Sequence, residues 1–381
     1  MLFYAKYFAD DLREIRPTVM SAVPRIWEHI YRKVVDNIRG EKITKKFLFY
    51  LFLLSREKML WSYRTLINRD TVIHKELFSV RLIKILYSLL TLIFLFIPGL
   101  LGYFVLAPIR EAVGGRLRAF TGGEAIPKYI DNFFNTVGIP LLNAYGMTEC
   151  SPGISSRRFD WNFLYTVGIP FEHTQIKVTD NNGNEIADGE KGIVWVKGPQ
   201  VMRGYYKNEA ETKRILTEDG WLNTGDVGAF SSRKNLIILG RVKDTIVLLG
   251  GENVEPTPIE EKLEECEFIT HAVVVGDDEK DLGALLVLEE ERINKLFEEW
   301  GEDYKNFEET IKNNKLKKFV KYQIDKYVNT SKDFHPFERI KNFRILPNKF
   351  NIGLELTESL KKKRLLIKSK YAQIIKEMYE K

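Results

Sequence analysis

Thr224-Gly225-Asp226, Gly240-Arg241 and Gly251-Glu252-Asn253-Val254-Glu255-Pro256 follow one another in the second half of this chain. Glycine turns allow a backbone to approach a flat ligand closely. The carboxylate of Asp226 can accept hydrogen bonds from both hydroxyls of a ribose, and the rigid guanidinium of Arg241 can hold ribose or phosphate. These segments therefore predict a nucleotide site, directly followed by the start of a new domain.

A second polar segment, Asn143-Ala144-Tyr145-Gly146-Met147-Thr148-Glu149, lies upstream. Tyr145 offers an aromatic face for a purine, and Asn143 offers an amide for its edge. Thr148 supplies a hydroxyl for phosphate, and Glu149 supplies the hard oxygen ligand that Mg²⁺ prefers. Taken alone, this segment is equally typical of a polar turn after a buried strand.

Read together, the motifs resemble those of the adenylate-forming (AMP-binding) enzyme family. The Gly-Glu-Asn-Val sequence at 251–254 resembles the long-chain fatty acid–CoA ligases of that family in particular. This resemblance implies ATP, Mg²⁺, CoA and a long-chain fatty acid as ligands, and activation of the acid through an acyl-adenylate. It implies nucleotide-binding roles for Gly123, Glu124, Ala125, Asn143, Tyr145, Asp226 and Arg241, and places phosphate and metal contacts at Thr148 and Glu149.

The same resemblance implies roles for two lysines. Lys243 lies where the family has the hinge between its large domain and its mobile small domain. Near the C-terminus the family has a catalytic lysine in a Thr-x-Ser/Thr-x-Lys-x-x-Arg pattern. The matching residues are Thr357, Ser359, Lys361 and Arg364, with Leu360 where many relatives have glycine. From the residues alone, Lys243 also suits a surface ion pair, and the basic run a solvated helix face.

The length and net charge of the chain limit its domain organisation and its partners. A chain of 381 residues is too long for one ordinary core, so two or three domains are expected. Its net charge of +6 is spread along the sequence, which suits anionic small molecules or an anionic membrane and gives no reason to expect nucleic acid. Two distant cysteines and no secretory signal indicate the cytoplasm, with peripheral attachment to the inner face of the membrane.

The predicted fold is a multidomain chain of the α/β and α+β classes. Residues 1–158 are predicted as the C-terminal part of a large α/β adenylation domain with a mixed sheet, carrying a hydrophobic insert at about 82–109. Residues 159–242 are predicted as a small β subdomain, and 243–381 as a mobile C-terminal α+β domain. Within these, residues 1–40 are expected to form two helices, and 289–330 a long helical region with apolar residues every three or four positions.

The insert contains no charged residue from Ile85 to Ile109. Its length would allow it to span a membrane, but Pro98-Gly99 is expected to divide it into two shorter pieces. Three interpretations stay open: an interfacial or re-entrant membrane contact, a buried core or acyl-tunnel wall, and a transmembrane span.

One expected motif is missing. The family's Ser/Thr/Gly-rich loop, which wraps the β- and γ-phosphates of ATP, normally precedes the Arg-Pro-Thr segment found here at 16–18, and no such loop is present. The chain is therefore expected to be the C-terminal portion of a ligase with weak or no ATP turnover of its own. The alternatives are another adenylate-forming ligase, such as an aryl-CoA ligase, and a non-catalytic membrane-associated nucleotide- or acyl-binding remnant.

Overall fold

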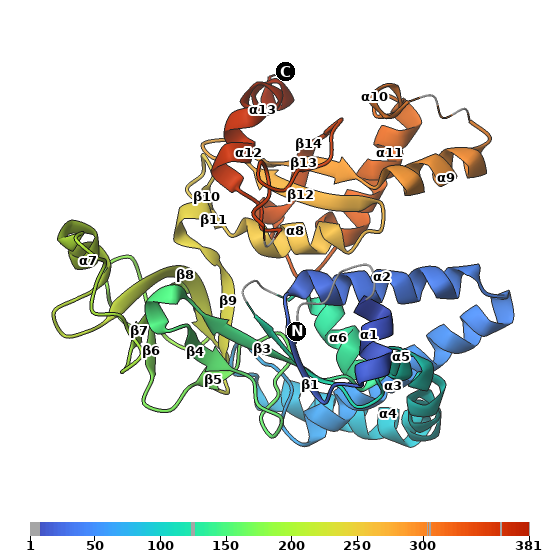
Figure 1. Cartoon of the computed structure of the whole chain (residues 1–381), viewed down its shortest axis with the longest axis horizontal. Helices are drawn as coiled ribbons and strands as arrows, with labels where there is room; N and C mark the ends of the chain where they lie inside the picture. The colour runs from blue at the N-terminus through green and yellow to red at the C-terminus, as the bar shows by residue number, and fades with distance from the viewer. Residues whose placement is uncertain (1–7, 123–125, 303, 305, 359, 381) are drawn as a thin grey trace. The chain divides into compact units, whose positions relative to one another are not determined.

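The structure is a computed structural model that describes residues 8–122, 126–302, 304, 306–358 and 360–380. The chain divides into two compact units, Met1–Ile238 and Leu239–Lys381. Each unit has its own hydrophobic core and is described by itself (Figure 1). The mixed α/β architecture confirms the predicted fold class.

A five-stranded sheet in the order β1-β2-β3-β4-β5 organises the first unit. Its parallel strands are β1 (Val19–Ala22), β2 (Arg118–Gly122) and β3 (Leu141–Gly146), and the antiparallel strands β4 (Gly153–Ser156) and β5 (Ile169–Pro170) complete it. Four helices accompany the parallel strands, and most of them contribute buried residues to the core of this unit (Figure 1). They are α1 (Phe8–Ile15), α2 (Pro24–Gly40), α5 (Ala107–Ala112) and α6 (Lys128–Val137).

Strand β1 corrects the expectation of two helices and a turn over residues 1–40. The four residues Val19–Ala22 pair in parallel with β2, starting at Val19 opposite Arg118. Such a short strand carries little alternation of its own, and its hydrogen-bond partners lie about a hundred residues away. The pairing with β2, rather than local propensity, decides its conformation.

Two long helices form the most extended element of the first unit: α3 (Ile43–Leu66) and α4 (Phe78–Val105). They pack against each other along much of their length. The expected division at Pro98-Gly99 is wrong, because α4 continues through Pro98. Proline removes one hydrogen bond from a helix. Here Gly99 and Gly102, which follow Pro98, pack closely against α3 and support the helix beyond that gap.

A second sheet in the first unit has the order β6-β7-β8-β9. Its strands are β6 (Gln175–Thr179), β7 (Gly192–Lys197), β8 (Leu222–Phe230) and β9 (Leu236–Arg241), the last of which leads into the second unit, and helix α7 (Glu209–Ile215) precedes β8. The segment 181–184 forms a turn, in which the Asp180 carboxylate accepts hydrogen bonds from the backbone N–H groups of Asn182 and Asn184.

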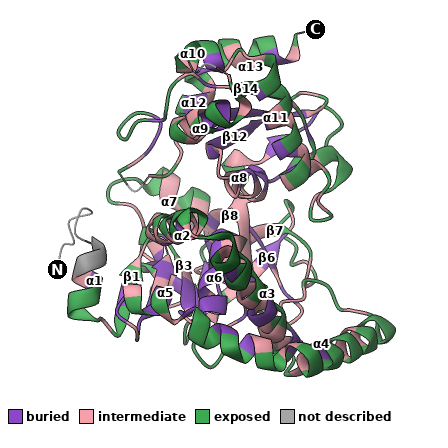
Figure 2. Cartoon of the chain, turned by 90° about the vertical axis from the view of Figure 1, so that its right-hand side faces the viewer, coloured by how far each residue is buried: buried purple, intermediate pink, exposed green. Residues whose placement is uncertain are grey.

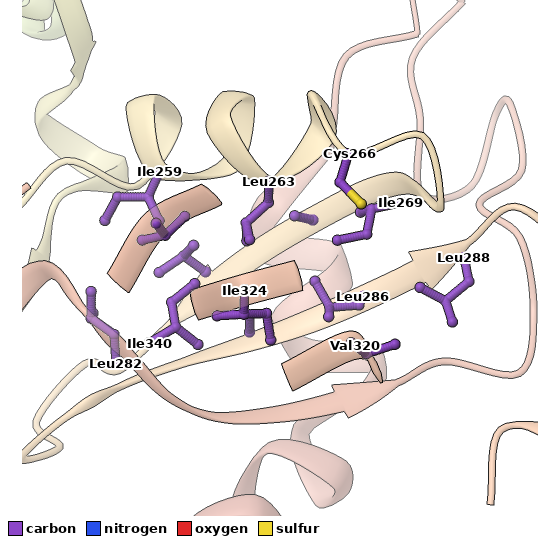
Figure 3. Packing of buried hydrophobic residues seen from close by; sticks show 14 of the residues in the cluster. Ile259, Leu263, Cys266, Ile269, Leu282, Leu286, Leu288, Val320, Ile324 and Ile340 are labelled. Atoms are coloured by element: carbon purple, nitrogen blue, oxygen red, sulfur yellow. The ribbon is translucent and has the colours of Figure 1, made fainter. Parts of the chain in front are cut away.

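The second unit is a three-stranded sheet with helices on both faces. Its strands are β12 (Ile269–Val275), β13 (Leu282–Leu288) and β14 (Ile340–Ile345), with β13 antiparallel to β12 and parallel to β14. Alternate residues of β12 enter two different cores. One core, shown in Figure 3, includes residues of α8 (Pro256–Glu264) and α11 (Asn314–Ile324), and the other includes residues of α12 (Arg364–Lys370) and α13 (Ala372–Tyr379).

The long helical region expected at 289–330 is broken into pieces. Helix α9 (Glu290–Trp300) ends at Gly301, which has a left-handed φ of 65°. The short α10 (Phe307–Thr310) follows, capped by the Asn306 side chain, and α11 is capped by Asn313. The region has apolar residues at the expected spacing but is not one helix, because Gly301 ends α9 and the N-caps Asn306 and Asn313 begin new helices. A π-helical segment, Asp325–Asn329, follows α11, and a 3₁₀ turn lies at Pro336–Glu338. Strands β10 (Ile246–Val247) and β11 (Asn253–Val254) form a small hairpin.

Candidate nucleotide site

Two adjacent side chains on β2 and β3 have buried polar atoms without hydrogen-bond partners. Thr121 on β2 lies in register with Asn143 on β3, and both side chains are almost fully buried. Among the described residues, Thr121 Oγ1 takes part in no hydrogen bond and Asn143 Oδ1 accepts none. Buried polar atoms are normally satisfied. This pair is therefore suited to a ligand that brings its own hydrogen-bonding groups to these two strands.

Residues 123–125, which directly follow β2, lie outside the described residues. The adenine contacts predicted for Gly123, Glu124 and Ala125 therefore stay predictions.

Tyr145 and Asp226 are brought together from β3 and β8. The Tyr145 hydroxyl donates a 2.6 Å hydrogen bond to Asp226 Oδ2. Burial of the phenol, and then the adjacent carboxylate, raises the pKa of Tyr145 well above its usual range, so the phenol stays a neutral donor. Thr224 Oγ1 donates to Val194 O at 2.8 Å and accepts from the Asp226 N–H at 3.1 Å, which fixes the carboxylate. Gly225 adopts the left-handed φ of 69° that this turn requires.

A third contact joins Glu149 to a residue that the sequence did not single out for a role. Glu149 lies in the 3₁₀ turn Thr148–Cys150, and its Oε1 accepts a 2.7 Å hydrogen bond from the Tyr205 hydroxyl. This hydrogen bond raises the pKa of Tyr205. The Glu149 carbonyl also accepts from the Met202 N–H at 2.8 Å. Thr148, the predicted phosphate contact, is exposed in the same turn. The predicted phosphate contact and the predicted metal ligand Glu149 therefore lie on one short turn.

The described residues hold no cluster of three or more metal-ligating side chains. Mg²⁺ is commonly held by one or two carboxylates together with substrate phosphates. A single carboxylate at Glu149 fits that donor set.

An ion pair behind β3 supports the site. Arg157 Nη1 lies 3.0 and 2.9 Å from the two carboxylate oxygens of Asp131 on α6, and both side chains are fully buried. The Arg157 N–H donates to the Asn143 carbonyl at 2.9 Å, and the Tyr165 N–H donates to Asp131 Oδ2 at 2.9 Å. The pair thus connects α6 to the strand that carries Asn143. No local sequence signal indicates a pairing between residues this far apart.

In the second unit, the neighbouring lysines Lys361 and Lys362 have different environments. Lys362 Nζ donates to Glu260 Oε2 at 2.5 Å, to Glu264 Oε1 at 3.0 Å and to the Ala272 carbonyl at 2.9 Å. Burial alone would lower the pKa of Lys362, but the two carboxylates outweigh it and the pKa is raised. Lys361 is exposed, and its ammonium has no partner in the described part of the chain. Of the two, Lys361 is therefore the side chain that can reach a substrate.

Glu260 anchors the loop that carries Lys361. Its carboxylate accepts two 2.6 Å hydrogen bonds from Arg364, in addition to the one from Lys362, and a further one from the Val274 N–H at 2.8 Å. Leu360 has a left-handed φ of 65°. This backbone conformation favours glycine. It therefore gives a physical reason why many members of the resembled family have glycine at this position.

The remaining predicted residues also belong to the second unit. Arg241 is exposed at the end of β9, and Lys243 is exposed in the 3₁₀ turn Val242–Asp244. Asp244 Oδ2 lies 3.7 Å from Arg364 Nε. The turn that carries Lys243 and the loop that carries Lys361 are therefore both tied to Arg364. The structure describes these residues separately from Tyr145 and Asp226, which lie in the first unit.

The two-unit fold and the polar turns together define the class of protein to which the chain belongs. A family model described as "AMP-binding enzyme" matches residues 2–206, and one described as "AMP-binding enzyme C-terminal domain" matches residues 243–381. The chain belongs to the AMP-binding enzyme family, which confirms the resemblance drawn from its motifs.

The curated relatives include ligases that are named for long-chain fatty acids. The chain is 34% identical over 298 residues to "Probable acyl-activating enzyme 16, chloroplastic" of Arabidopsis thaliana, a match that covers 74% of this chain and 41% of that protein. It is 30% identical to "Long-chain-fatty-acid--[acyl-carrier-protein] ligase AEE15, chloroplastic" of the same organism, covering 98% of this chain and 51% of the relative. The long-chain-fatty-acid–CoA ligase FadD15 of Mycobacterium bovis is 29% identical, with 98% and 58% covered. The chain thus spans about half the length of the curated relatives it matches.

Solved structures show the same fold. The adenylation domain of a carboxylate reductase from Mycobacterium chelonae aligns with a TM-score of 0.64 at 19% identity, covering 98% of this chain and 48% of that one. ATP-bound MatB from Rhodopseudomonas palustris aligns with a TM-score of 0.54 at 23% identity, covering 72% and 50%.

Proposed function

We propose that this chain takes part in the ATP-dependent activation of a long-chain fatty acid, first to an acyl-adenylate and then to a thioester. The observation that carries this proposal is the hydrogen-bonded pair Tyr145–Asp226, together with the unpartnered amide oxygen of Asn143. A neutral aromatic ring, a fixed carboxylate and a buried amide are the groups that recognise a purine nucleoside. The names of the relatives supply the substrate class.

In the proposed nucleotide site, Asn143 and Tyr145 contact the adenine, together with Gly123, Glu124 and Ala125. Asp226 and Arg241 hold the ribose. Thr148 and Glu149 face the phosphates, with Glu149 as the protein ligand of Mg²⁺, which when bound supplies positive charge to the phosphates. Tyr205 orients the Glu149 carboxylate through their 2.7 Å hydrogen bond.

The proposed first step forms a bond between a fatty-acid carboxylate oxygen and the α-phosphorus of ATP, while the bond to pyrophosphate breaks. Negative charge builds up around the phosphorus, so positioning and charge neutralisation matter most. The exposed ammonium of Lys361 supplies positive charge in this step. In the second step, a thiolate attacks the acyl carbonyl carbon and AMP leaves.

Lys243 is the proposed hinge between these two steps. A few residues that absorb large changes in φ and ψ are sufficient for such a motion. Its exposed position in a short 3₁₀ turn, next to the boundary between the two units, supports this role. Rotation there would withdraw Lys361 and admit the thiol.

CoA is the proposed thiol substrate. One relative is named as a ligase that uses acyl-carrier protein, so that protein is the alternative acceptor to compare. We also propose that the chain is cytoplasmic and contacts the inner face of the membrane peripherally through residues 85–109.

The test is thioester formation from ATP, Mg²⁺, palmitate and CoA. It is run with the chain alone and with the chain mixed with the N-terminal half of a relative, each beside an Asp226→Ala variant. Palmitoyl-CoA formed in either mixture, and lost in the variant, is the expected result. Absence of thioester in both mixtures, with AMP binding retained, would overturn the proposed activity and favour a non-catalytic nucleotide-binding protein.

A further inference from the structure

Helix α4 presents its large apolar side chains to the outside. The helical stretch Phe78–Ala112, which contains α4, is the one among the described residues that is long and apolar enough to cross a membrane by length and composition, yet only 17% of its apolar 18-residue window is buried. Figure 2 shows α4 mostly in the colour of exposed residues. Its exposed side chains include Ile83, Leu86, Leu90, Ile93, Phe94, Ile97, Leu101 and Phe104. Within the described residues, this helix is therefore mostly exposed and is not part of a hydrophobic core.

The face of α4 that is buried against α3 consists of small or polar residues: Ser88, Thr91, Gly99 and Gly102. A Cβ added at Gly99 would lie 2.7 Å from Met59 Sδ, and one added at Gly102 would lie 2.8 Å from the Phe52 carbonyl oxygen. Glycine is thus what allows the two helices to approach this closely.

The buried side of helix α3 is mixed. Besides Phe49 and Arg56, it contains the hydroxylated residues Ser55, Ser62 and Thr65. The Ser55 and Thr65 hydroxyls donate to the carbonyls of Leu51 and Trp61, four residues earlier in the same helix. Thr91 does the same on α4, donating to Tyr87 O at 2.8 Å. The hydroxyls are thus satisfied within their own helices.

Helix α6 of the same unit provides the comparison. Its buried residues include Ile130, Phe133, Phe134 and Val137, as expected where water drives large apolar side chains inward. In lipid that driving force is absent, and helices associate through small and hydroxylated residues with large apolar ones facing outward. The α3–α4 hairpin follows the second pattern. Small and hydroxylated residues of α4 face α3 while its large apolar residues face outward, and this arrangement favours lipid as the covering of α4.

Both ends of α4 are attached to the same unit. At its C-terminal end, Arg110 donates to Val137 O at 2.8 Å and to Tyr103 O at 2.7 Å. Before its N-terminal end, Thr71 Oγ1 donates to Leu164 O at 2.6 Å, and Val72 O accepts from the Ser232 N–H at 2.9 Å. A helix of 28 residues is about 42 Å long. A crossing helix would have to place these attachments on opposite sides of a hydrocarbon core about 30 Å thick.

We propose that the α3–α4 hairpin is a monotopic lipid anchor that lies flat in one leaflet, with the outward face of α4 among the acyl chains. This deepens the membrane contact proposed above and extends it from residues 85–109 to both helices. At the start of α3, the exposed apolar residues Ile43 and Phe47 are accompanied by Lys42 and Lys45. These lysines suit anionic headgroups at the rim of the contact.

The first test is flotation with vesicles of phosphatidylcholine and phosphatidylglycerol. The double variant Ile93→Glu/Phe94→Glu is expected to lose at least about tenfold in vesicle binding, because a carboxylate in the acyl region is costly. The matched control is Leu249→Glu, which changes a similarly exposed apolar residue (73% exposed against 74% for Phe94) outside the hairpin. Equal binding by the double variant, or an equal loss in the control, would overturn the proposal. The assay requires no nucleotide, so its failure is distinguishable from failure of the proposed function.

The second test measures depth without adding charge. Spin labels are placed at Leu86→Cys, Phe94→Cys and Leu101→Cys, with Leu249→Cys as the control, and their accessibility to oxygen and to a water-soluble nickel complex is compared on vesicles. A flat hairpin predicts similar, oxygen-rich depths at all three hairpin positions and a water-exposed control. A depth that is greatest at residue 94 and shallow at 86 and 101 would indicate a span. Hairpin labels that stay accessible to nickel would rule out lipid burial.

Discussion

The hydroxyl of Tyr145 on β3 lies 2.6 Å from the carboxylate of Asp226 on β8, which joins the two sheets of the first unit. Asp226 is almost fully buried, so its charge depends on the hydrogen bonds it accepts. The phenol stabilises that charge, and the carboxylate in turn holds the aromatic ring in place.

This relationship predicts the effect of Tyr145→Phe. The variant keeps the aromatic ring but removes a donor to a buried carboxylate, which costs about 1–3 kcal/mol. AMP affinity is expected to fall about tenfold, because the carboxylate is no longer held in position. Equilibrium binding of a fluorescent AMP analogue would measure this. Tyr206→Phe, at a highly exposed tyrosine, is the control, and an equal loss there would remove the special role of Tyr145.

Glu260 is predicted to hold the Lys361 loop. Glu260→Gln leaves the buried Lys362 and Arg364 without their shared charge partner, and breaking a buried ion pair costs about 3–5 kcal/mol. A lower melting temperature of the second unit and faster tryptic cleavage at residues 361–363 are expected. Glu265→Gln, which alters a pair with Lys262 on the surface side of α8, should change neither. Unchanged cleavage in the Glu260 variant would show that the loop is held by other contacts.

The two buried cysteines predict a loss of stability at alkaline pH. Burial raises the pKa of both Cys150 and Cys266 to about 11, from an ordinary value of 9.0. The folded chain therefore keeps these protons where the unfolded chain loses them. Their contribution to stability is complete below pH 9 and declines as the pH rises to about 11, by about 1.4 kcal/mol per pH unit for each thiol.

Urea unfolding in reductant at a series of pH values between 8 and about 11 would measure this decline. The double variant Cys150→Ala/Cys266→Ala should show a shallower decline than the unmodified chain. An identical slope in both proteins would contradict the assignment to the thiols.

Lys361 and Lys362 are predicted to behave differently although they are neighbours. Lys362→Ala removes a buried partner of Glu260 and Glu264 and should destabilise the second unit. Lys361→Ala alters an exposed side chain and should leave the melting temperature within about 1 °C, as expected for surface substitutions. Differential scanning calorimetry of the two variants would test this. A reversed order would mean that the catalytic lysine was assigned to the wrong position.

Much of the candidate site could be predicted because its signals are local. A glycine turn that ends in a carboxylate, as at 224–226, and a polar turn after a strand, as at 143–149, are each contained within a few residues. The fold class and the small β subdomain could be predicted for the same reason, since alternation and turn residues are visible in the sequence itself.

The features that were missed depend on distant partners. Strand β1 requires β2, and the Asp131–Arg157 pair joins α6 to the segment after β4. Helix α4 was expected to break at Pro98, because the supporting contacts of Gly99 and Gly102 with α3 cannot be seen in the sequence. The orientation of the hairpin, with small residues of α4 facing α3 and large apolar residues facing outward, also could not be predicted. The sequence shows that 85–109 is apolar, but not which side faces outward.

The most direct measurement is formation of labelled palmitoyl-AMP from ATP labelled at the α-phosphate, with Mg²⁺ and palmitate and without CoA. It compares the unmodified chain, mixed with the N-terminal half of a relative, with Lys361→Ala in the same mixture. The account predicts labelled acyl-AMP from the unmodified chain and loss of it in Lys361→Ala, while both convert supplied palmitoyl-AMP and CoA to palmitoyl-CoA. Equal adenylate formation by the two proteins, or none by either, would contradict it.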